Sequence, residues 1–70
     1  MKLGINLRTG DSIVVNDFTH VNYGTDNIKT VKAENLSNFN IYSVTYNFVG
    51  NKESITVSGP DILYLQLLNE

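Results

Sequence analysis

The chain has no cysteine and only one histidine among its 70 residues. The lack of cysteine excludes disulfide bonds and thiolate metal sites. A core of this size rarely supplies more than about 3 to 5 kcal/mol, so small natural proteins often add a disulfide, a metal or a partner chain. With disulfides excluded, tight packing or self-association remains, and we expect a homo-oligomer.

Basic residues are also few. The chain has five Lys and Arg and seven Asp and Glu, which gives a net charge of −2. This balance argues against broad attraction to nucleic-acid phosphates or anionic membranes, although a local basic face remains open. No apolar run reaches the length of a signal peptide's apolar region or of a bilayer span. We therefore expect a cytoplasmic protein with no membrane association.

What the chain does contain is the composition of an ordinary globular domain. Its hydrophobic fraction of 41% and charged fraction of 17% differ from the low hydrophobicity and high net charge of disordered chains. At this length the chain makes one domain at most. The sequence therefore predicts a single folded domain over residues 1–70.

The most regular pattern runs over residues 40–49, Asn-Ile-Tyr-Ser-Val-Thr-Tyr-Asn-Phe-Val. Because successive side chains of a strand leave opposite faces, this alternation predicts a β-strand. The first face, predicted to belong to the core, carries Tyr42, Val44, Tyr46 and Phe48. The opposite face carries Ile41 and Val49 at its two ends.

Shorter alternations surround this strand. Residues 2–7 and 12–15 predict a hairpin with Gly10 in the turn, where a positive φ suits glycine. Residues 21–23 predict a third strand, which continues after a turn over residues 28–32. Residues 54–58 predict the partner of the 40–49 strand in a second hairpin.

Two segments admit more than one structure. Residues 32–39 favour a loop or a short helix, because Asn and Ser lower the helix propensity of an otherwise suitable spacing. Residues 62–67 follow the Gly59-Pro60-Asp61 turn and could be a strand or a helix. We prefer the strand, because so short a helix does not support itself in water and Leu63, Leu65 and Leu67 form one apolar face.

These elements indicate an all-β fold, a small antiparallel sheet of five to six strands or an SH3-like barrel, with room for one short helix. The Gly59-Pro60-Asp61 turn between two strands resembles the turn before the last strand of SH3-like small barrels. The whole chain, with ten asparagines, is similar to short β-rich proteins of unknown function in phages and mobile elements of Gram-positive bacteria. Neither resemblance transfers a functional residue.

Residues with catalytic potential are scattered. His20 and Asp17 could form a proton-transfer pair or half of a metal site, but spacing indicates neither a third ligand nor a nucleophile, so we favour two polar residues at a turn. The glycines do not form a phosphate-binding loop. We therefore expect no enzyme activity, no cofactor and no metal.

The remaining apolar residues favour a non-enzymatic protein-interaction or assembly module with a protein partner. The candidate interface residues are Ile41, Val49, Leu63, Leu65 and Leu67. The alternative is a nucleic-acid-binding small barrel, in which rings beside basic residues would contact the strand. The candidate residues of that face are Arg8, Tyr23, Lys29, Lys32 and Lys52. A third possibility is a small ligand in a concave pocket.

Overall fold

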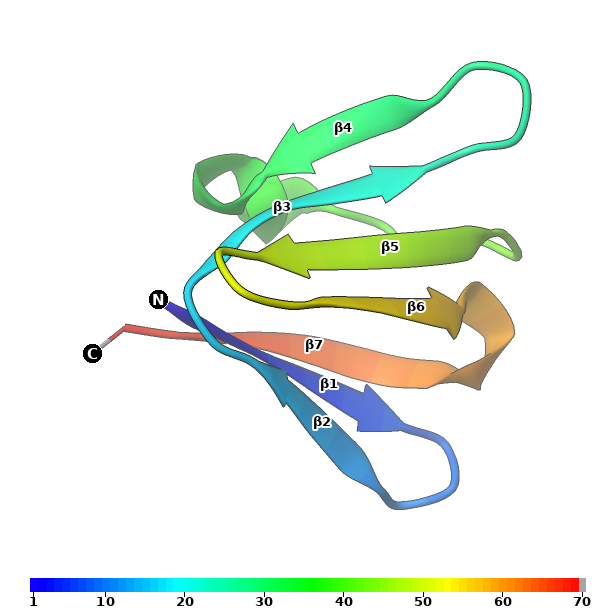
Figure 1. The fold of residues 1–70 in the computed structure, drawn as a ribbon. Coiled ribbons are helices and arrows are strands. Elements are labelled where there is room, and N and C mark those ends of the chain that lie inside the picture. The colour runs from blue at the N-terminus through cyan, green and yellow to red at the C-terminus, as the bar shows by residue number, and fades with distance from the viewer. Residues whose placement is uncertain (70) are drawn as a thin grey trace.

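The computed structural model describes residues 1–69, except for the side chain of Asn38. Its strands are β1 (Lys2–Leu7), β2 (Ser12–Val15), β3 (Phe18–Tyr23), β4 (Lys29–Lys32), β5 (Thr45–Gly50), β6 (Ser54–Ser58) and β7 (Ile62–Leu68). They form two antiparallel sheets, with orders β2-β1-β7 and β4-β3-β5-β6 (Figure 1). The predicted all-β class is confirmed. The expected count of five to six strands is wrong, since the described residues hold seven, and the two sheets do not close into a barrel.

The hairpins are the part of the fold that local sequence determines. β1 pairs with β2 around Gly10, whose φ of 98° lies in the left-handed region that glycine adopts without steric cost. β5 pairs with β6 in the second predicted hairpin. β3 and β4 also pair, which confirms the predicted strands on either side of the turn at residues 24–27.

The C-terminal segment is a strand, as we predicted, and it pairs antiparallel with β1. Asn6 lies opposite Tyr64 and Leu7 opposite Ile62, so Leu63 is an extra residue in a β-bulge. The bulge places Ile62 in the core and leaves Leu63 52% exposed. The predicted uninterrupted face of Leu63, Leu65 and Leu67 is therefore wrong at Leu63.

The strand predicted over residues 40–49 begins only at Thr45. Contact with β6 ends at Val44, whose carbonyl accepts a hydrogen bond from the N–H of Gly59 at 2.7 Å. The N–H of Tyr42 bonds instead to the hydroxyl of Tyr46. Tyr46 and Phe48 are fully buried, as predicted, whereas Tyr42 is 61% exposed and does not belong to the core.

The core is formed by the inner faces of both sheets and by a 3₁₀ turn, η1 (Ala33–Asn38). Its buried apolar residues are Leu3, Ile5, Val15, Phe18, Val21, Leu36, Tyr46, Phe48 and Ile62. Leu36 comes from η1, so the segment predicted as a loop or short helix contributes to the core. A second 3₁₀ turn, η2 (Gly59–Asp61), leads from β6 into β7.

Gly59 is the position where the fold tolerates a side chain least. A Cβ there would overlap the carbonyl oxygen of Tyr42 and lie 2.8 Å from that of Val44. We expect Gly59→Ala to lower the free energy of unfolding by about 1–3 kcal/mol, because backbone must move to admit the methyl group.

The matched control is Gly4→Ala, where the added Cβ would make ordinary contacts, the nearest at 3.6 Å from the carbonyl oxygen of Gln66. We expect this variant to equal the wild type or to gain up to about 1 kcal/mol, since alanine suits a strand better than glycine. Urea denaturation measures both. Equal stability of the two variants would show that residues 42–44 do not pack on η2 as described.

Candidate functional site

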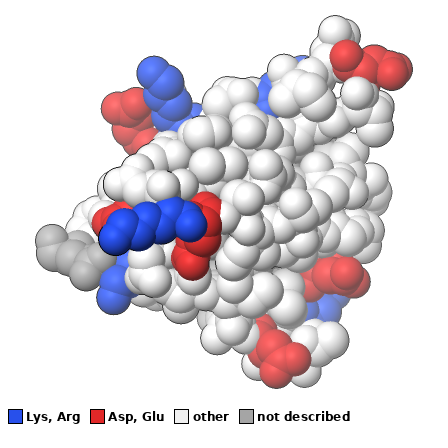
Figure 2. All heavy atoms as spheres, in the orientation of Figure 1, with Lys and Arg blue, Asp and Glu red and all other residues white. Residues whose placement is uncertain are grey.

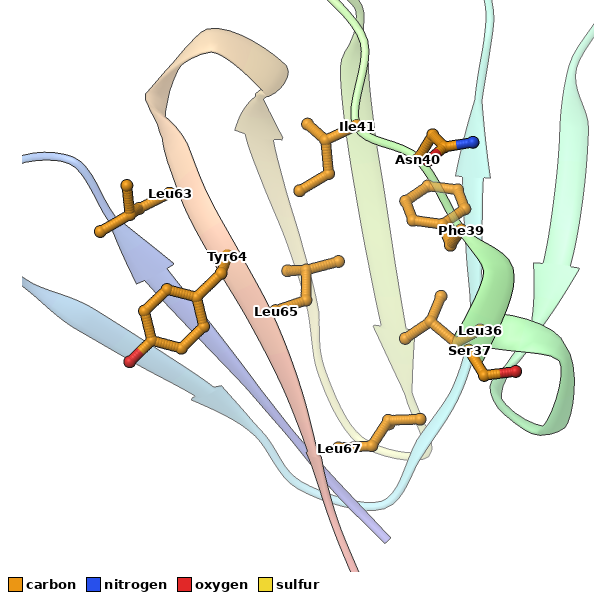
Figure 3. Close-up of a pocket in the computed structure, with 9 residues that line it drawn as sticks. All are labelled: Leu36, Ser37, Phe39, Asn40, Ile41, Leu63, Tyr64, Leu65 and Leu67. Carbon is orange, nitrogen blue, oxygen red and sulfur yellow. The ribbon is translucent and has the colours of Figure 1, made fainter.

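An open groove of about 500 Å³ lies between β7 and the segment that follows η1 (Figure 3). Nine residues line it: Leu36, Ser37, Phe39, Asn40, Ile41, Leu63, Tyr64, Leu65 and Leu67. None of these side chains carries a formal charge, and most are apolar. The groove therefore offers a surface that favours an apolar, uncharged ligand.

Four of the five candidate interface residues meet in this groove, although they come from two distant parts of the sequence. Ile41 lies on one side of it, and Leu63, Leu65 and Leu67 lie on the other. Val49 does not line the groove, since it lies on β5 opposite His20 and Ser54. The two residues expected on one strand face are separated because β5 does not extend to Ile41.

One side of the groove is β7. Figure 3 shows Leu65 and Leu67 directed toward Leu36 and Ile41 across the groove, whereas Leu63 and Tyr64 project from the other side of the β7 ribbon. This division follows from the bulge at Leu63, which interrupts the alternation of the strand. β7 consequently presents apolar side chains on both of its faces.

The other side of the groove is held in place by Tyr46 of β5. Its hydroxyl accepts a hydrogen bond from the N–H of Tyr42 at 2.7 Å and donates one to the carbonyl of Asn40 at 3.5 Å. The rings of Phe39 and Tyr46 also make an edge contact, with centroids 5.4 Å apart. Sequence reasoning placed Tyr46 in the core and missed this role, although a buried tyrosine hydroxyl usually requires a partner.

The candidate nucleic-acid residues do not gather on one face. Lys29 and Lys32 are the two ends of β4, while Lys52 and Arg8 lie in turns of different hairpins. Figure 2 shows Lys and Arg in separate places on the visible face, one of them across its left side next to acidic residues, while its centre and right hold mostly uncharged residues. The ring of Tyr23 lies 5.3 Å from that of Tyr46 and 5.6 Å from that of Phe39, so it packs within an aromatic cluster.

His20 bonds to its neighbour Thr19. The hydroxyl of Thr19 donates to the carbonyl of Val49 at 3.0 Å and lies 2.8 Å from Nδ1 of His20. These two contacts hold the ring of His20 beside Thr19, at the sheet position opposite Val49. Asp17 lies in the turn between β2 and β3 with a φ of 52°, which aspartate tolerates better than most residues. Across residues 1–69, no group of three His, Cys, Asp or Glu could hold a metal ion.

A second, smaller depression of about 360 Å³ lies beside the turn between β3 and β4. It is lined by Asn22, Tyr23, Gly24, Ile28, Thr45 and Asn47. The side-chain carbonyls of Asn22 and Asn47 accept hydrogen bonds from Thr30 and Thr56 of the neighbouring strands. These bonds tie the polar side chains of the depression to the sheet, and the larger groove remains the stronger candidate.

Comparison of the chain with protein-family models, curated proteins and solved structures finds no match. No residue role is therefore carried over from another protein. Within residues 1–69, the structure contains no helix that is long and apolar enough to cross a membrane.

The hydroxyl of Tyr46 provides a test of how the groove is built. We expect Tyr46→Phe to lower the free energy of unfolding by about 1–3 kcal/mol, because the N–H of Tyr42 would lose its acceptor in a partly buried position. Amide hydrogen exchange at Tyr42 should also become faster. Chemical denaturation and exchange measured by NMR would record the two effects.

Tyr64→Phe is the matched control, because it removes a hydroxyl from an exposed tyrosine on the opposite side of the groove. We expect its stability and the exchange at Tyr42 to equal those of the wild type. The same exchange rate in both variants would contradict the role given to Tyr46.

Proposed function

We propose that the protein is a non-enzymatic interaction or assembly module that binds an apolar, uncharged protein segment at the groove, along β7. The observation that carries this proposal is the convergence of Ile41, Leu65 and Leu67 on one open groove, with Leu63 at its rim. Burial of such side chains by a partner is favourable, at about 25 cal/mol per Å² of apolar area. A charged segment would lose hydration there and find no formal charge in the lining to compensate for it.

The exposure of the groove rim also supports the proposal. Leu63 and Tyr64 are neighbours and both are exposed. Large apolar side chains that gather at the surface, rather than occurring singly, are typical of interaction sites. The groove has a defined shape before any partner binds, because Tyr46 holds one side and the pairing of β7 with β1 holds the other. A preformed site reduces the entropy lost on binding.

We also propose that the fold is an open relative of SH3-like small barrels. Three features support this proposal: η2 leads directly into the last strand, the last strand pairs with the first, and only two residues separate β2 from β3 across the two sheets. The origin in a phage or mobile element and the cytoplasmic location stay predictions from the sequence.

Selection from a random peptide display library tests the interaction function. We expect the selected peptides to be rich in apolar residues and poor in charged ones. Leu63→Lys should weaken the binding of their synthetic versions about tenfold, equivalent to about 1.4 kcal/mol, because it places a charge at the rim of an apolar site. Fluorescence polarisation with labelled peptides gives the dissociation constants.

Ile28→Lys is the matched control, since Ile28 is an aliphatic residue with 63% exposure that lies outside the groove. Peptides should bind this variant as they bind the wild type. Failure to select any peptide at concentrations where the chain is monomeric, or equal binding to the Leu63→Lys variant, would refute the proposed site.

A further inference from the structure

The second edge of β7 has no hydrogen-bonded strand partner among the described residues. β7 is the last strand of the β2-β1-β7 sheet and pairs with β1 alone among the described residues. Its second edge therefore carries backbone N–H and C=O groups that have no strand partner. Such an edge is a template for pairing with another chain, and natural proteins usually protect it.

Two of the other three edge strands carry protection that residues 64–68 of β7 lack. β4 begins and ends with a lysine and, like β2, has only four residues. The exposed side chains of β6 are polar. β7 has seven residues and no charged side chain. Of the seven large apolar side chains that the described residues expose, three lie on β7, namely Leu63, Tyr64 and Leu68.

We propose that β7 pairs antiparallel with β7 of a second copy of this chain, about a twofold axis at Gln66. The inference rests on the proposed function, because it identifies the apolar segment that binds along β7 as the same strand of another copy. The pairing would join the two three-stranded sheets into one sheet with the order β2-β1-β7-β7-β1-β2.

The sequence of β7 is complementary to itself in this register. Residues 64–68 pair regularly with β1, beyond the bulge at Leu63. Pairing about Gln66 places Leu65 opposite Leu67 of the second copy on the groove side. On the outer side it places Tyr64 opposite Leu68 of the second copy. Apolar residues thus meet apolar residues on both faces.

The residue at the axis also suits pairing with itself. The exposed Gln66 would lie opposite Gln66 of the second copy, and each side-chain amide has both donors and an acceptor. No like charges oppose each other along the strand. A partner of this kind also supplies stability that a small domain without disulfides lacks.

A charge-exchange experiment at Gln66 tests this geometry. Sedimentation equilibrium of the wild type at high micromolar concentration should give twice the chain mass of 7.8 kDa. Gln66→Lys and Gln66→Glu should each raise the dimer dissociation constant at least about tenfold, because like charges would meet at the axis. An equimolar mixture of the two variants should restore the dimer, since the opposed charges then attract.

The matched controls are Ser12→Lys and Ser12→Glu, which change the charge of an exposed residue on the opposite edge of the same sheet. Both should associate like the wild type. Thermal unfolding followed by circular dichroism should show that all four variants fold, as expected for substitutions at exposed positions.

Three results would overturn the inference: a wild type that stays monomeric, Gln66 variants that dimerise as the wild type does, or a mixture that associates no better than either variant alone. The proposed function is tested separately by the peptide selection. A monomeric chain whose groove binds selected peptides would refute the β7 pairing and leave the groove as an interaction site. A monomeric chain that binds no peptide would refute both.

Discussion

The hydrogen bonds of the Tyr46 hydroxyl are the constraint on which the rest of the site depends. This side chain is fully buried, and its hydroxyl satisfies backbone groups of Tyr42 and Asn40 that would be paired in a longer strand. The segment before β5 is thereby held away from strand pairing and against the aromatic cluster of Phe39 and Tyr23. The groove exists because this segment lies opposite β7 rather than continuing the sheet.

A second constraint acts from the other side of the groove. The bulge at Leu63 lets Ile62 enter the core and still returns Leu65 and Leu67 to the groove side. Without an extra residue, a strict alternation would place Ile62 and Leu65 on opposite faces. The bulge therefore satisfies the core and the groove with the same short run of apolar residues, and it leaves Leu63 and Tyr64 exposed.

The sequence predicts those parts of the fold that local pattern and turn chemistry determine. The hairpin around Gly10, the β5–β6 hairpin and the strand nature of residues 62–67 all follow from alternation and turn residues. The start of β5 could not be predicted, because residues 40–44 alternate as well as residues 45–49 do. The alternation does not show that the hydroxyl of Tyr46 bonds to the backbone of Tyr42 and Asn40, in place of a neighbouring strand.

The candidate site shows the same division between local and distant information. Leu65 and Leu67 were grouped correctly on one face, since period-two alternation is a local property. Leu63 was misplaced because the bulge arises from pairing with Asn6 and Leu7, far away in the sequence. Ile41 lies in the groove because residues 40–44 do not continue β5, and the strand pattern of the sequence does not predict this. Two open sheets also have four edge strands, whereas a closed barrel has none. Each edge strand therefore needs its own protection against pairing with another chain. In the described structure β4 carries lysines and β2 is short, whereas β7 is longer and has no charged side chain, so residues 64–68 beyond its bulge form the edge most suited to pairing with another chain.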